Sequence, residues 1–207
     1  TDAYLRITVS RGAGEIGLDP GLCPRATVVI MAKPLHPSPP VLSRDGVSLT
    51  VANTRRNLPE ALSPQIKSTN FLNNILAKRE SIAAGTFDSL FLNWKDELTE
   101  CTVSNLFFIS GKTLHTPALD CGILDGITRT IVMTLAQEEG VPVREGHYHL
   151  ADLQRAEECF LTNTSMEIIP VNRVDSFAIG DGRPGSLTRR LQTRFADSRT
   201  RFLEPTS

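Results

Sequence analysis

Apolar and polar residues follow the period of a β-strand near the start of the chain. Residues 4–9 alternate between the two kinds, which predicts a half-buried strand, and residues 26–32 form a continuous apolar run that predicts a second one. A glycine-rich loop, residues 11–17, separates the two runs. Two strands are too few for a core of their own, so we expect them to belong to a sheet that other elements complete.

Two longer segments carry apolar residues at the spacing of a helix. In residues 127–139 the inward positions are Ile131, Val132 and Leu135. The apolar positions of residues 68–84 are Phe71, Leu72, Ile75, Leu76, Ile82 and Ala83. A glycine follows each segment, as it commonly does where a helix ends. The pattern therefore predicts two amphipathic helices.

Shorter segments fill the rest of the chain. They predict strands at residues 47–52, 89–92, 102–109, 113–116, 158–161 and 168–171, and helices at residues 149–155 and 187–195. Strands and helices are mixed without a regular βαβ repeat, which predicts the α+β class.

A proline-rich stretch divides the chain. Residues 34–40 contain four prolines, which favour an extended linker over a helix or an interior strand. We therefore expect residues 1–33 to belong to one domain, residues 34–45 to link it to the next, and residues 46–207 to form a large domain.

Composition excludes several classes of protein. The 207 residues are 40% hydrophobic and carry 22 Lys and Arg against 23 Asp and Glu, a net charge of −1, which argues against disorder. No basic stripe interleaved with aromatic residues points to nucleic acid. No apolar run approaches the roughly 20 residues of a membrane helix, and no signal-peptide pattern opens the chain. We expect no nucleic-acid or membrane partner.

The metal-binding residue types form no recognisable motif. His147 and His149 alternate as two ligands on a strand would, but no third ligand lies near them in sequence, so we expect surface histidines and no metal site. Four cysteines are spread along the chain without a CxxC pair: Cys23, Cys101, Cys121 and Cys159. They predict reduced thiols in a cytoplasmic protein.

Lys67 is one of only five lysines, against seventeen arginines. It precedes a predicted helix between Ile66 and Phe71, where partial desolvation would favour the neutral amine. A neutral amine is a nucleophile toward carbonyl groups. The alternative is an ordinary lysine whose ammonium group reaches the solvent.

Glu100 leads into a strongly apolar run, residues 101–109. A carboxylate in such surroundings predicts a buried acid with a specific partner. The alternative is a glutamate at the edge of a strand, facing water.

Two polar segments could bind an anion. Ile127 and Thr128 open the second predicted helix, where free N–H groups and a hydroxyl suit a phosphate. The alternative is that Thr128 only caps the helix. Thr164 and Ser165 lie in a polar loop after a predicted strand, a common arrangement that carries little weight alone.

Taken in order, five stretches resemble the class IV aminotransferases, the fold-type IV pyridoxal-phosphate enzymes. That family includes branched-chain and D-amino-acid aminotransferases and aminodeoxychorismate lyase. The stretches are residues 66–78 (IKSTNFLNNILAK), 99–107 (TECTVSNLF), 116–117 (TP), 122–129 (GILDGITR) and 161–171 (LTNTSMEIIPV).

The resemblance implies a fold, a cofactor and a role for each candidate residue. Residues 46–207 would form the large, mixed-sheet, pseudo-barrel domain that binds pyridoxal 5'-phosphate, and residues 1–33 the C-terminal part of a small α/β domain. Lys67 matches the lysine that forms the aldimine with the cofactor, and Glu100 the carboxylate that pairs with the pyridine nitrogen. Ile127 and Thr128 match the residues that hold the phosphate, and Thr164 and Ser165 the loop beside it. A homodimer is implied as well.

The start of the chain departs from the family pattern. It has no initiator Met and begins almost directly with a strand, so either a leader was removed or the chain begins inside a larger protein. Family members carry a longer small domain, which supplies an arginine to the phosphate and much of the substrate pocket. We therefore expect a fragment of a longer polypeptide.

The resemblance leaves the reaction open. Transamination between an amino acid, of the D-amino-acid or branched-chain type, and a 2-oxo acid is the commonest activity of the family. The short spacing from Lys67 to Asn70 resembles the D-amino-acid aminotransferases and the lyases more than the branched-chain enzymes. The Arg55-Arg56-Asn57 segment also resembles some lyases, which would release 4-aminobenzoate and pyruvate. A third alternative is a truncated domain without activity. We expect the transaminase.

Overall fold

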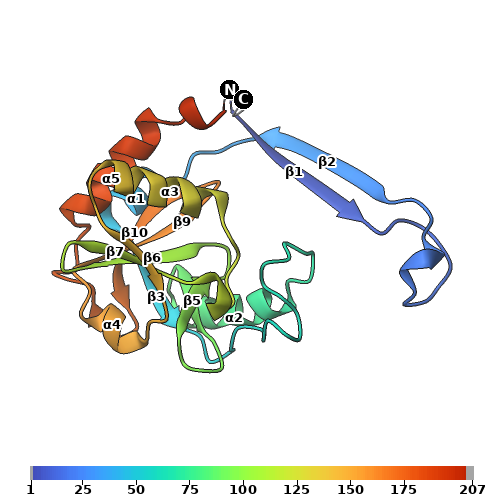
Figure 1. Ribbon diagram of the computed structural model, residues 1–207, viewed down its shortest axis with the longest axis horizontal. Coiled ribbons are helices and arrows are strands. Elements are labelled where there is room, and N and C mark those ends of the chain that lie inside the picture. The colour runs from blue at the N-terminus through green and yellow to red at the C-terminus, as the bar shows by residue number, and fades with distance from the viewer. Residues whose placement is uncertain (1, 204–207) are drawn as a thin grey trace. The chain divides into compact units, whose positions relative to one another are not determined.

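The structure is a computed structural model that describes residues 2–203 (Figure 1). The chain divides into two compact units, Thr1–Ser38 and Pro39–Ser207. No helix in the described part of the chain is long and apolar enough to cross a membrane.

The first unit is a β-hairpin. Strand β1 (Ala3–Ser10) pairs antiparallel with β2 (Thr27–Pro34) over their full length, and a 3-10 helix (Pro20–Leu22) lies in the connection. Both predicted strands are thus confirmed. Apolar side chains such as Ile7 and Ile30 are exposed, because two strands provide no second layer to cover them.

The proline-rich stretch contains a short helix. Residues 35–39 have no regular structure, whereas residues 40–45, which the sequence assigns to an extended linker, form helix α1 (Pro40–Asp45). Pro40 occupies the first helical position, where its missing N–H group would have no partner within the helix anyway. Here proline begins a helix rather than preventing one.

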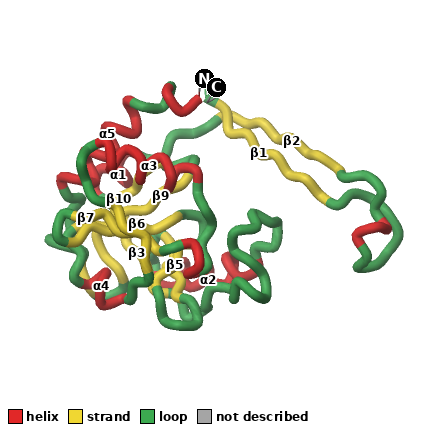
Figure 2. Tube along the Cα trace, viewed as in Figure 1, coloured by secondary structure: helices red, strands yellow, loops and turns green. Residues whose placement is uncertain are grey.

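The second unit is built on a nine-stranded mixed sheet (Figure 2). Its strands are β3 (Val47–Val51), β4 (Asp88–Leu92), β5 (Leu98–Cys101), β6 (Asn105–Ser110), β7 (Thr113–Pro117), β8 (Val143–Gly146), β9 (Glu158–Asn163), β10 (Glu167–Val174) and β11 (Phe177–Ala178). Neighbours follow the order β11–β10–β3–β4–β5–β6–β7–β8, and β9 pairs with both β10 and β6. The ring β10–β3–β4–β5–β6–β9 is therefore closed, which confirms the expected α+β fold with a barrel-like sheet.

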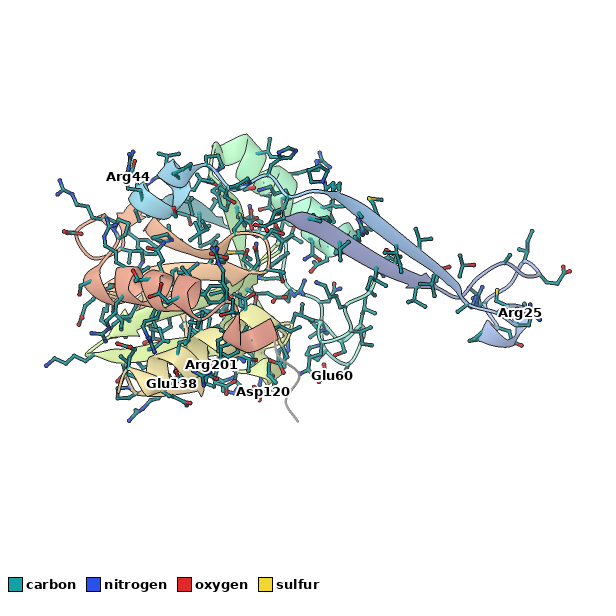
Figure 3. The ribbon with its side chains drawn as sticks, turned by 90° about the horizontal axis from the view of Figure 1, so that it is seen from above. Arg25, Arg44, Glu60, Asp120, Glu138 and Arg201 are labelled. Carbon is teal, nitrogen blue, oxygen red and sulfur yellow. The ribbon has the colours of Figure 1, made fainter. Side chains whose placement is uncertain are left out.

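Helices cover this sheet on more than one side. Besides α1 they are α2 (Leu72–Ala84), α3 (Ile127–Glu138), α4 (Leu150–Gln154) and α5 (Ser186–Asp197), with 3-10 helices at Leu119–Cys121 and Arg201–Leu203. Helices α3 and α5 pack against each other and against β9, while α2 packs against β3 and β4 (Figure 1). Arg201 pairs with Glu138 at the end of α3, and Figure 3 labels both.

Both faces of strand β6 are buried. Leu106 and Phe108 pack with apolar residues of the other ring strands, whereas Phe107 and Ile109 pack beneath α3, which contributes Leu135. A strand buried on both faces needs no polar alternation, which explains the continuous apolar run in the sequence.

The structure corrects the predicted strand at residues 102–109. The chain instead forms the hairpin of β5 and β6, and its turn is closed by the N–H group of Cys101, which donates to the Ser104 oxygen at 2.8 Å. The turn contains neither glycine nor proline, which are the strongest turn signals in a sequence.

Helix α2 also differs from its prediction. It begins at Leu72, four residues later than expected, because the N–H group of Asn70 donates to the Ser68 hydroxyl at 3.2 Å and the chain turns there. Ala77 and Ser81 are its buried residues. The exposed apolar positions of α2 are Leu72, Ile75, Leu76 and Ile82. The stripe that predicted the helix faces away from the sheet.

Candidate active site

Glu100, the third residue of β5, is buried, with a side chain that is 7% exposed. Arg56 Nη2 donates to its Oε1 at 2.5 Å. Its Oε2 accepts from Asn105 Nδ2 at 3.1 Å and from the N–H group of Leu124 at 3.0 Å. The structure thus contains the buried acid that the apolar run predicts, and Arg56 is its ionic partner.

Arg56 is itself held on several sides. Its Nε donates to the Gly122 oxygen at 3.2 Å, and its Nη1 to the side-chain oxygens of Asn73 at 3.4 Å and Asn74 at 3.3 Å. The guanidinium also lies over the ring of Phe91, 5.3 Å from its centroid. The two asparagines belong to α2, so this arginine joins α2 to the sheet.

Burial raises the pKa of Glu100 to about 7, above its usual value of 4.5, because desolvation disfavours the charged form. The charge of Arg56, the N–H group of Leu124 and the charge of Lys67 act in the opposite direction. The Lys67 ammonium therefore lies within electrostatic reach of Glu100. Since every polar neighbour of the carboxylate is a donor, the ionised form is the one that the geometry satisfies.

Strand register aligns Glu100 with two further polar residues. Glu100 lies opposite Asn105 across β5 and β6, and Asn105 lies opposite Thr162 across β6 and β9. Thr162 is buried, and its hydroxyl has no partner among the described residues. A buried hydroxyl without a partner is costly, so the Thr162 hydroxyl is able to make one more hydrogen bond.

The N-terminus of α3 lies next to Asn105, the middle residue of the row Glu100–Asn105–Thr162. Gly126 precedes the helix, and a Cβ there would lie only 2.1 Å from Asn105 Oδ1, so the close approach requires glycine. No side chain of a described residue caps the helix. Thr128 lies inside α3, which rules out its role as a cap, and Ile127 is 79% exposed. Uncapped N–H groups at this end suit an anion.

The turn between β9 and β10 follows Thr162 and Asn163 in the chain. Asn163 donates to the Ser104 hydroxyl at 3.0 Å, and its Oδ1 accepts from the N–H groups of Ser165 and Met166. Thr164 and Ser165 are exposed. Asn163 therefore shapes the turn and leaves the hydroxyls of Thr164 and Ser165 free for a ligand.

Lys67 lies in the loop that precedes α2. The expectation that Ile66 and Phe71 desolvate it is wrong, because all three residues are exposed. No hydrogen bond or ion pair to another described residue holds the Lys67 ammonium. A groove of about 340 Å³ separates this loop from α2 and is lined by residues that include Leu62 and Leu76.

Three polar residues of this site were not predicted as functional from the sequence: Arg56, Asn105 and Thr162. Two features of the sequence could have pointed to them. Arg56 lies in a segment that becomes buried, and Asn105 is the first residue of an apolar strand. Neither signal identifies the partner, because Arg56 is 44 residues from Glu100 in the chain.

Comparison with known proteins gives a consistent result. Residues 1–174 match the sequence model of the family described as amino-transferase class IV. The chain is 39% identical over 201 residues to a Methanocaldococcus jannaschii protein named, provisionally, as a branched-chain-amino-acid aminotransferase, covering 97% of this chain and 69% of the relative. It is 34% identical to the aminodeoxychorismate lyase of Bacillus subtilis, over 92% of this chain and 64% of the relative. It is 38% identical to a D-alanine aminotransferase of Listeria monocytogenes, over 66% and 47%.

Solved structures agree with these relatives. The T.th. branched-chain amino acid aminotransferase, solved with pyridoxamine 5'-phosphate, superposes with a TM-score of 0.90 at 28% identity, covering 95% of this chain and 65% of that one. The Escherichia coli branched-chain enzyme gives a TM-score of 0.89 at 30% identity, over 94% and 65%. The chain thus spans roughly half to two thirds of the length of these proteins.

Proposed function

The chain belongs to the class IV aminotransferase family, and we propose that it binds pyridoxal 5'-phosphate through Lys67 and moves an amino group between an amino acid and a 2-oxo acid. One observation carries the proposal. A buried carboxylate, Glu100, lies within electrostatic reach of Lys67 and beside the uncapped N-terminus of α3. An acceptor for a ring nitrogen, an amine and an anion site therefore lie in one region of the molecule.

The residues present fit this cofactor. Glu100 accepts three hydrogen bonds, and a carboxylate offers about four acceptor positions, so one remains for a ring N–H group. The N–H groups of Ile127 and Thr128 and the free hydroxyls of Thr164 and Ser165 suit its phosphate. The unpartnered hydroxyl of Thr162 lies along the same line. When bound, pyridoxal phosphate supplies an electron sink for the carbanion at the substrate Cα.

Each residue then has a distinct task. Lys67 Nζ would hold the cofactor and would serve as the base for the proton on the substrate Cα. Glu100 would accept the N–H group of the ring nitrogen, and Arg56 and Asn105 hold Glu100 in place. The N-terminus of α3 orients the phosphate without needing a charged side chain.

The test is the visible spectrum of the purified chain after incubation with pyridoxal 5'-phosphate. We expect an absorption band of the lysine-bound cofactor, and borohydride reduction should place the label on the peptide that contains Lys67. Lys67→Ala should abolish both results, whereas Lys95→Ala, which removes another exposed lysine, should leave them unchanged. A label that persists in Lys67→Ala refutes the assignment. A chain that takes up no cofactor instead supports the inactive, truncated domain.

We place the substrate in the branched-chain class, because the relative with 39% identity and both structures cited above are branched-chain enzymes or are named as such. The lyase is the second candidate, because the Bacillus subtilis relative matches 92% of this chain. Keto acid formed from leucine and 2-oxoglutarate supports the transaminase. Pyruvate and 4-aminobenzoate formed from aminodeoxychorismate, without that keto acid, support the lyase.

The outward apolar face of α2 supports a homodimer. Leu72, Ile75 and Ile82 are 64%, 55% and 68% exposed, and Val103 beside the helix is 64% exposed. An apolar stripe of this kind stays in water only at a free-energy cost, so we propose that it packs against a second copy of the chain. Ile75→Lys should then halve the molar mass measured by light scattering, whereas Arg79→Ala on the same helix should not. An unchanged mass in Ile75→Lys refutes this interface.

A further inference from the structure

Three connecting segments of the second unit bring Glu97, Cys121 and His147 together. Glu97 precedes β5, Cys121 ends a 3-10 helix, and His147 follows β8. One donor atom from each lies within 4.8 Å of the other two. His147 Nδ1 is 3.1 Å from Glu97 Oε1 and 3.5 Å from Cys121 Sγ. The two histidines had no third ligand in the sequence, but the tertiary structure supplies two partners for one of them.

The two separations from His147 Nδ1 are close to those expected of ligands around one tetrahedral ion. Zinc binds nitrogen and oxygen at about 2.0–2.1 Å and sulfur at about 2.3 Å, so tetrahedral angles place nitrogen and oxygen about 3.3 Å apart and nitrogen and sulfur about 3.6 Å apart. A thiolate, an imidazole and a carboxylate also form a donor set that favours zinc over magnesium or calcium.

A buried asparagine already orients two of the three donors. Asn93 is 4% exposed, and its Nδ2 donates to Glu97 Oε2 at 2.7 Å and to the Cys121 backbone oxygen at 3.2 Å. Its Oδ1 accepts from the N–H group of Glu97 at 3.0 Å. These bonds leave Glu97 Oε1 directed at His147. Hydrogen bonds from outside the donor set that fix ligands in this way are typical of metal sites.

A second carboxylate holds the far side of the imidazole. His147 Nε2 is 3.3 Å from Asp120 Oδ2, and Asp120, labelled in Figure 3, is exposed. An N–H group at Nε2 that donates to a carboxylate leaves Nδ1 unprotonated and free to bind a metal. The Cys121 thiol donates a long hydrogen bond to the Gly146 oxygen at 3.7 Å, which an ion would replace with a bond to the thiolate sulfur.

We propose that Glu97, Cys121 and His147 bind one Zn²⁺ ion, with water in the fourth position. On binding, the S–H bond of Cys121 breaks, the thiolate sulfur bonds to the ion, and the proton passes to solvent. The His147 side chain is 45% exposed, which gives the ion a path from solvent and room for the water.

This site borders the candidate active site without sharing its residues. The chain runs from Cys121 to Gly122, whose oxygen accepts from Arg56, and on to Leu124, whose N–H group donates to Glu100. An ion bound at Cys121 would therefore fix the start of the segment that supports Glu100. We expect it to raise the melting temperature of the full chain.

The test uses the full chain and Co²⁺, which reports on zinc sites spectroscopically. We expect one ion per chain, a thiolate-to-cobalt band in the near-ultraviolet difference spectrum, and quenching of Trp94, the single tryptophan, three residues before Glu97. Cys121→Ser should remove the band. His147→Gln and Glu97→Gln should each weaken binding by at least about 100-fold, and Asp120→Asn by about 10-fold.

Matched controls separate this site from adventitious binding. Cys23→Ser removes a more accessible thiol, and His149→Gln a histidine two residues from His147, and both should bind Co²⁺ as the parent chain does. A band that survives Cys121→Ser overturns the proposal. So does a chain that binds no stoichiometric Co²⁺ yet loses stability in His147→Gln, since that result identifies ion pairs alone.

Discussion

Glu100 and Lys67, at the two ends of the candidate active site, differ in how many contacts within the chain hold them in place. Glu100 is 5% exposed, and three donors hold its carboxylate. Lys67 is exposed in a loop, and no described residue makes a hydrogen bond or ion pair with its ammonium. One end is thus held by contacts within the chain before any ligand binds, and the other is open.

The difference follows from where each residue lies in the fold. Glu100 belongs to a strand of the closed ring, so its neighbours on β6 and β9 come with the sheet register. Lys67 belongs to a segment without regular structure between β3 and α2. Strand pairing positions a side chain within the chain's own core, whereas a loop needs something to pack against. We expect the cofactor, or a partner surface, to complete the lysine end.

The largest effect is expected when Glu100 loses its ionic partner. Arg56→Leu leaves a buried carboxylate without its ionic partner, which should lower the free energy of unfolding by about 3–5 kcal/mol. Urea denaturation followed by circular dichroism measures the change. The double variant Arg56→Leu/Glu100→Leu should recover most of the loss, because it buries no uncompensated charge. A loss below about 1 kcal/mol in the single variant would show that Arg56 does not stabilise the buried carboxylate.

The pH dependence of the free energy of unfolding tests the burial of Glu100 without a substitution. The pKa of Glu100 is about 7 in the folded chain and near 4.5 when unfolded. Between these values the folded chain keeps a proton that the unfolded chain has lost, so the free energy of unfolding falls as pH rises through that window. The full change is about 3 kcal/mol, and it is complete above pH 7.

Glu100→Gln is the control for this effect, because its amide does not titrate. The difference in unfolding free energy between parent and variant, measured by urea denaturation from pH 4 to pH 8, should therefore shift in favour of the variant as pH rises. Parallel profiles for the two proteins would mean that burial does not raise the pKa of Glu100.

The smallest effect is expected in the loop. Ile66 lies next to Lys67 and is 62% exposed, so Ile66→Ala should change the free energy of unfolding by less than about 0.5 kcal/mol. Leu106 on β6 is fully buried, and Leu106→Ala should cost about 2–5 kcal/mol. Thermal denaturation of the two variants gives the contrast. A comparable loss in both would show that the loop is packed after all.

Much of the fold could be predicted from local patterns. The strands of the first unit, helix α3 and most strands of the sheet lie where periodicity places them, because alternation and helical spacing are local properties. The hairpin of β5 and β6 could not be predicted, because no glycine or proline marks its turn. The outward face of α2 could not be predicted either, since periodicity identifies a stripe but not what covers it.

The chemical groups at the candidate site can be recognised from the amino-acid sequence. Lys67, Glu100 and the segment that opens α3 are recognisable from order and spacing along the chain. Their partners and exposure depend on the three-dimensional fold, which places Arg56 on Glu100, an open loop at Lys67, and Cys121 and Glu97 beside His147. The physical reason is that pairing and desolvation depend on which distant segments the closed sheet brings into contact, and the sequence records no such distances.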